Sequence, residues 1–136
     1  MQYAITTAVD APFDETLAAT REALADQGFG VLTEIDLAAT LKAKVGADID
    51  PHVILGACRP QLAEKAVAQE ASIGLLLPCN IVVRADGNRR TLVEALDPDV
   101  MVGVTENEQL KDVASEARTR LDAALTALPT RVGSPA

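Results

Sequence analysis

The chain has 136 residues, of which 49% are hydrophobic, and a formal net charge of −8. This size and composition fit one domain that buries its own core without a metal ion or a disulfide bond. The acidic excess opposes contact with nucleic-acid backbones and anionic lipids, and an aromatic content of 2% argues against stacking of single-stranded bases. No apolar run is long enough to cross a bilayer, and no basic and apolar leader follows Met1. We therefore expect a cytoplasmic protein without a nucleic-acid or membrane partner.

The first third of the chain predicts a strand, a helix, a second strand and a short helix. Residues 3–9 alternate with the two-residue period of a half-buried strand. Pro12 is placed to open a helix and Gly28 to cap its end. A strand is then expected over residues 29–35 and a short helix over residues 37–45.

The stretch from His52 to Val83 holds the only histidine, both cysteines and the most apolar runs of the chain. Its pattern predicts a strand over residues 53–57 and a helix that begins near Pro60, a residue suited to a first helical turn. A further strand is expected over residues 73–83, interrupted at Pro78, which cannot donate a hydrogen bond to a neighbouring strand.

The last part of the chain predicts a β-hairpin followed by a long helix. Asp86-Gly87-Asn88 is typical of a tight turn, so residues 81–84 should pair antiparallel with residues 91–96. Leucine, valine and alanine recur at three- and four-residue steps over residues 106–128, as in an amphipathic helix.

These elements predict an α+β fold: an antiparallel-rich sheet of about five strands, with helices packed on one face. Residues 1–128 should form a single domain. Residues 129–136 lack an apolar pattern and are predicted to be a mobile C-terminal tail.

Several separated motifs agree in order and spacing with one known family. They are GFGVLTEID (Gly28–Asp36), ATLKAKVG (Ala39–Gly46), ILGACRP, IGLLLPCNIVV and TLVEALDP. On these motifs the chain resembles the domain-of-unknown-function family 302, over nearly its whole length from Ile5 to Leu128. The resemblance implies a compact α+β domain that forms homodimers and has no settled biochemical role, and it associates some members with haem b.

His52 is the residue through which this chain could bind a haem. On an extended strand His52, Ile54 and Gly56 point the same way, and Gly56, without a side chain, would leave room for a flat cofactor. One histidine cannot build a multi-histidine metal site in a single chain. A two-fold axis would supply a second copy, so that two His52 side chains could bind one haem b at a dimer interface. The alternative is a surface histidine at the start of a strand.

Cys58 and Cys79 support a second hypothesis, a thiol-based sulfur-handling or redox protein that acts through Cys79, with Cys58 as a second thiol. Whether the thiols meet depends on strand direction, because only adjacent antiparallel strands bring these positions together. Both cysteines could instead be small buried hydrophobes, as free cysteines often are. Their separation in the sequence excludes a Cys-x-x-Cys motif.

The sequence gives little support to calcium binding, nucleotide binding or serine-based catalysis. Asp97, Asp99, Glu106 and Glu108 match no known calcium-binding loop and suggest a solvated acidic rim. The serines have no histidine partner by pattern, and no glycine motif for nucleotide phosphates occurs. We therefore expect a non-catalytic ligand-binding homodimer, with the thiol protein and a structural partner-binding module as alternatives.

Overall fold

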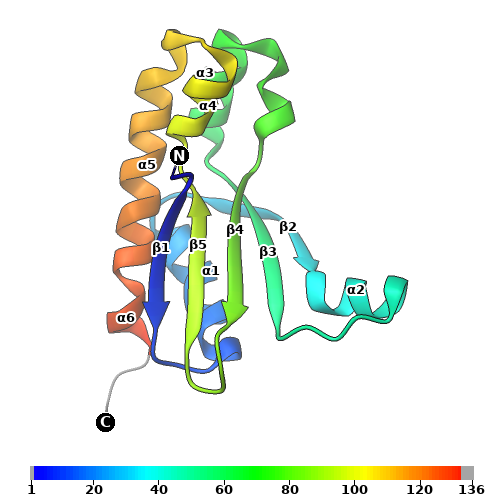
Figure 1. Ribbon diagram of the computed structural model, residues 1–136. Coiled ribbons are helices and arrows are strands. Elements are labelled where there is room, and N and C mark those ends of the chain that lie inside the picture. Colours follow the sequence, from blue (N-terminus) through cyan, green and yellow to red (C-terminus); the bar gives the residue numbers. More distant parts are fainter. Residues whose placement is uncertain (1, 133–136) are drawn as a thin grey trace.

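The computed structural model describes residues 2–132. Within this range five strands form one sheet in the order β1-β5-β4-β3-β2, and every neighbouring pair is antiparallel (Figure 1). The strands are β1 (Ala4–Val9), β2 (Gly30–Asp36), β3 (His52–Cys58), β4 (Cys79–Ala85) and β5 (Thr91–Leu96). The predicted α+β class and five-stranded antiparallel sheet are confirmed.

The helices differ in how they meet the sheet. Helices α1 and α5 run along one face of it, and α2 projects from the end of β2 at the side of the molecule (Figure 1). The bounds are α1 (Phe13–Asp26), α2 (Leu37–Val45), α3 (Pro60–Gln69), α4 (Asp99–Thr105), α5 (Lys111–Thr126) and α6 (Leu128–Arg131), with short 3-10 helices η1 (Ala71–Leu76) and η2 (Glu108–Leu110).

Local chemistry explains where the first helices begin and end. The predicted bounds of α2 are confirmed: the Asp36 side chain accepts a hydrogen bond from the Ala39 amide, and Gly46 ends the helix in the left-handed conformation. After α1, Gly28 has a φ of +83°, which turns the chain directly into β2. The Asp86 amide donates to the Arg90 carbonyl across the predicted β4–β5 turn.

The main core lies between the sheet and helices α1, α5 and α6. Alternate residues of each central strand point into it, as the two-residue strand period requires, so that Val53, Leu55 and Ala57 of β3 are all buried. The helices contribute Leu24, Leu121 and Leu128 among other residues. A second buried cluster joins α3, η1, α4 and α5 at one end of the sheet.

The predicted strand over residues 73–83 is wrong in its first half. Residues 71–76 form the 3-10 helix η1, in which Ile73 is buried within the second cluster, and the strand begins only at Cys79. A short apolar run has no periodicity that separates a strand from a buried helical turn, which explains the error.

The predicted helix over residues 106–128 and the predicted tail also need correction. The chain first forms α4 and η2, and α5 begins at Lys111. Residues 129–131 belong to α6 and are not a free tail, because Arg131 pairs with Asp26 and Val132 packs against the main core. Residues 133–136 of the predicted tail lie outside the described residues.

The core depends on the leucines that α5 places against the sheet. Replacing the fully buried Leu121 by alanine should lower the free energy of unfolding by about 2–5 kcal/mol, because the cavity left behind cannot close completely. The same change at Leu75, which is 87% exposed, should alter it by no more than about 0.5 kcal/mol. Urea denaturation of both variants measures the difference, and equal losses would contradict this assignment of the core.

Candidate functional site

The sheet has a second face, opposite α1 and α5, which we call the open face. Paired residues of antiparallel strands share a face, and alternate residues point to opposite faces. Because Val53 and Leu55 point into the core, their neighbours His52 and Ile54 point to the open face. His52 pairs with Arg84 of β4, and Ile54 pairs with Val82.

Aliphatic side chains occupy the middle of the open face. Ile35 of β2, Ile54 of β3 and Val82 of β4 form one row across three strands, and Leu92 of β5 pairs with Arg84 in the adjacent row. A solvated face of an antiparallel sheet is normally polar. A row of aliphatic residues beside a histidine is instead typical of a surface that another molecule covers.

Two charged residues adjoin this aliphatic row. The Nε atom of Arg84 donates a hydrogen bond to Oε1 of Glu94 at 2.7 Å. This hydrogen bond, together with the negative charge of Glu94, raises the pKa of Arg84 above its ordinary value. Both side chains are partly exposed, so the pair lies at the surface of the open face and not beneath it.

A hollow of about 300 Å³ lies on the open face next to this ion pair. It is lined by Tyr3 and Ala4 at the start of the chain, by Asn80 and Val82 of β4, and by Glu94 and Leu96 of β5, among other residues. The open face therefore has an aliphatic floor with a few polar groups at its margin, an arrangement common in small-molecule sites.

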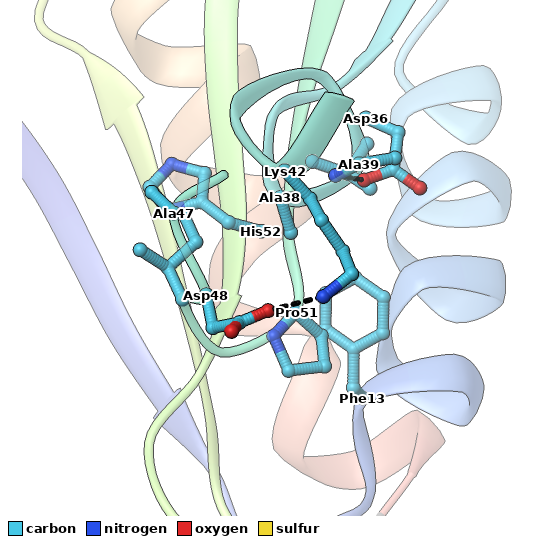
Figure 2. Close-up of a pocket in the computed structure, with 11 residues that line it drawn as sticks. Phe13, Asp36, Ala38, Ala39, Lys42, Ala47, Asp48, Pro51 and His52 are labelled. Carbon is cyan, nitrogen blue, oxygen red and sulfur yellow. Dashed lines mark hydrogen bonds and ion pairs between the residues drawn. The ribbon is translucent and has the colours of Figure 1, made fainter. Parts of the chain in front are cut away.

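His52 borders a separate pocket of about 280 Å³ between α2, the loop that follows it and the start of α1. Figure 2 shows Lys42 and Asp48 facing one another in this pocket, joined by an ion pair of 2.6 Å. The imidazole of His52 extends away from this pair and from the ring of Phe13 (Figure 2). The imidazole is therefore available to the open face.

The expectation that Gly56 leaves room for a flat cofactor is wrong. A Cβ atom at Gly56 would collide with the side chain of Thr33 and would lie 2.7 Å from Cγ of Pro78. The glycine is needed because its neighbours on β2 and before β4 already fill the space above it. Of the three residues predicted to bind the cofactor, His52 and Ile54 lie on accessible surface, whereas Gly56 is buried.

The two cysteines do come together, at the far end of β3 from His52. Strands β3 and β4 are adjacent and antiparallel, with Ala57 opposite Cys79, and both cysteines line a cavity of about 30 Å³ beneath α3 and α5. Burial, and to a lesser extent the charge of Cys58, raises the pKa of Cys79 to about 11. At neutral pH the Cys79 thiol is therefore protonated and a poor nucleophile.

Among the acidic residues near the end of β5, the carboxylate of Asp97 has structural partners. Asp97 pairs with Arg118 and accepts a hydrogen bond from the amide of Asp99, which helps to start α4. Within residues 2–132, no group of three or more histidine, cysteine, aspartate or glutamate side chains is arranged to hold a metal ion. No helix in that range is both long and apolar enough to span a membrane.

Sequence reasoning missed Arg84 and Glu94 as part of the site. The signal was present, because the predicted hairpin over residues 81–96 alternates buried aliphatic residues with Val82, Arg84, Leu92 and Glu94. Assigning each residue of that hairpin to one face of the sheet would have placed Arg84 and Glu94 together on the face away from the core. Its position beside His52 needed the β3–β4 register as well.

The filled space at Gly56 gives a direct test of this geometry. Gly56→Ala should destabilise the protein by about 1–3 kcal/mol, because either Thr33 or Pro78 must move. Gly103→Ala is the matched control: nothing lies within 4 Å of the added carbon, and alanine favours the helix α4. Thermal unfolding compares the two variants, and a Gly56→Ala protein as stable as the parent would contradict the packing described.

A protein family and a solved structure are similar to this chain. No curated protein matches the sequence. A crystal structure from Bacillus stearothermophilus, described as an uncharacterized conserved protein DUF302, matches with a TM-score of 0.87 and 30% sequence identity. The match covers 94% of this chain and 99% of that one. The model of the family described as "Domain of unknown function DUF302" matches residues 5–128. The chain therefore belongs to the DUF302 family.

Proposed function

We propose that this protein is a non-catalytic, cytoplasmic homodimer that binds haem b between two open faces, with His52 of each chain as the residue that would hold its iron. One observation carries the proposal. The only imidazole of the chain stands on a sheet face that α1 and α5 leave uncovered, next to the aliphatic side chains of Ile54 and Val82.

The dimer follows from the same face. A two-fold axis brings identical surfaces together, so the row of Ile35, Ile54 and Val82 on one chain would cover the same row on its partner. Burial of these side chains would supply the favourable free energy of association. The axis would also bring a second imidazole to the interface, which a single chain cannot provide.

The residues around His52 fit a haem in their chemistry. Imidazole nitrogen is a common axial ligand of haem iron, and aliphatic side chains suit the flat surface of the macrocycle. Three adjacent strands offer a surface about 10 Å wide for it. A bound haem would supply a redox-active iron. This chain would supply its ligand and its apolar surroundings through His52, Ile54, Ile35 and Val82.

A titration of the purified apo protein with haem b tests the proposal. The Soret band should shift and saturate at one haem for every two chains, and His52→Ala should abolish the shift. Lys42→Ala is a control, because Lys42 is tied to Asp48 in the neighbouring pocket and lies away from the imidazole. An absent shift, or the same shift in His52→Ala, would refute this function.

A second candidate is a thiol-based redox protein that acts through Cys58 and Cys79. The observation that favours it is the shared cavity, which both cysteines line. Two thiols held at adjacent strand ends can pass two electrons and two protons to an oxidant and form one disulfide bond. The raised pKa of Cys79 weighs against this candidate, because the thiol is the unreactive form.

Mass spectrometry after peroxide treatment examines this candidate. If it is correct, the folded chain loses two hydrogen atoms while the peroxide is reduced to water, and a Cys58–Cys79 disulfide is found. The Cys58→Ser variant cannot form it. If the cysteines have no redox role, iodoacetamide at neutral pH should modify the half-buried Cys58 well before the buried Cys79. Modification of Cys79 should then increase as the pH approaches its pKa of about 11.

A further inference from the structure

Arg84 is the cation closest to His52 on the open face by strand register. The two residues are directly paired across β3 and β4, and opposed side chains of an antiparallel pair have Cβ atoms about 5 Å apart. Leu92 of β5 flanks Arg84 on its other side. The register therefore puts Arg84 on the same face as the imidazole, on the neighbouring strand, with its guanidinium group held toward Glu94 of β5.

The guanidinium group of Arg84 has hydrogen-bond donors that Glu94 does not occupy. Glu94 accepts the hydrogen bond from Nε of Arg84, and within residues 2–132 the two terminal nitrogens of Arg84 have no hydrogen-bond partner. A guanidinium group presents its donors in a planar fork that matches the two oxygens of a carboxylate. The side chain is 39% exposed, so these donors can be reached from solvent.

Glu94 has a separate role in this arrangement. It pairs with Val82 across the hairpin, one row away from Arg84, and reaches back to hold the Nε atom. This contact limits the rotation of a long side chain that would otherwise lose conformational freedom on binding. The carboxylate of Glu94 also opposes a second negative charge nearby, so it lowers the affinity for an anion while it orients the cation.

We propose that Arg84 binds a carboxylate of the ligand that His52 coordinates, and that Glu94 is a positioning residue for Arg84. The inference rests on the proposed function and adds the class of ligand: a flat apolar molecule with carboxylates at one edge. For haem b these carboxylates are the propionates. Arg84 then selects against a ligand of the same shape whose edge is neutral.

The experiment titrates the apo protein with haem b and with its dimethyl ester, which lacks the negative charges, and follows the Soret band. Arg84→Gln should weaken binding of haem b by about two- to fivefold and leave binding of the ester unchanged. Glu94→Gln removes a competing charge but keeps an oxygen that can accept from Nε, so it should tighten binding of haem b. Arg90→Gln, which removes the same charge from the β4–β5 turn where Arg90 pairs with Asp86, should change neither titration.

The outcomes separate the two proposals. If the parent protein shows a His52-dependent shift but Arg84→Gln binds haem b as tightly as the parent, only the role of Arg84 is overturned. Equal weakening by Arg84→Gln and Arg90→Gln also overturns it, because the effect would then be general to net charge. No shift in the parent protein overturns the proposed function and this inference together. Circular dichroism of each variant establishes that the fold is retained.

Discussion

The antiparallel pairing of β3 with β4 is the interaction on which the other features of this protein depend. One register aligns Val53 with Val83 and Leu55 with Ile81 on the core face. The same register places His52 beside Arg84 and Ile54 beside Val82 on the open face. A shift of one residue would exchange the two faces, expose the core residues and bury the charged ones. Stability and the candidate site are therefore set by the same hydrogen bonds.

The two faces of the sheet have different surroundings. Helices α1, α5 and α6 cover one face and form the main core with it, and in Figure 1 α1 and α5 lie on the same side of the strands. The open face carries an aliphatic row, the imidazole of His52 and the ion pair between Arg84 and Glu94. An apolar row costs free energy when it stays in water. Association of two open faces, with a ligand between them, would remove that cost.

The two candidate sites lie at opposite ends of β3. His52 is the first residue of the strand and Cys58 the last, so the strand separates them by about 20 Å. The environments of the two sites also differ. His52 and Arg84 are accessible groups on a surface, whereas Cys79 is buried and its thiol has a pKa of about 11. This contrast favours a binding role for the open face and a packing role for Cys79.

The sequence by itself determined the local elements and the family. Alternation over residues 3–9, the capping residues of α2 and the turn at Gly87 act through neighbours in the chain, so their patterns can be recognised without a fold. Only the tertiary structure decided that Thr33 and Pro78 fill the space at Gly56, that the cysteines share a cavity, and that Arg84 stands beside His52. It also decided that residues 71–76 form a helical turn, because Ile73 is buried in a cluster with residues of α4 and α5, which lie far along the chain. The physical reason is the same in each case. Strand register and packing bring together residues that are far apart in the sequence, and local sequence patterns do not predict those contacts.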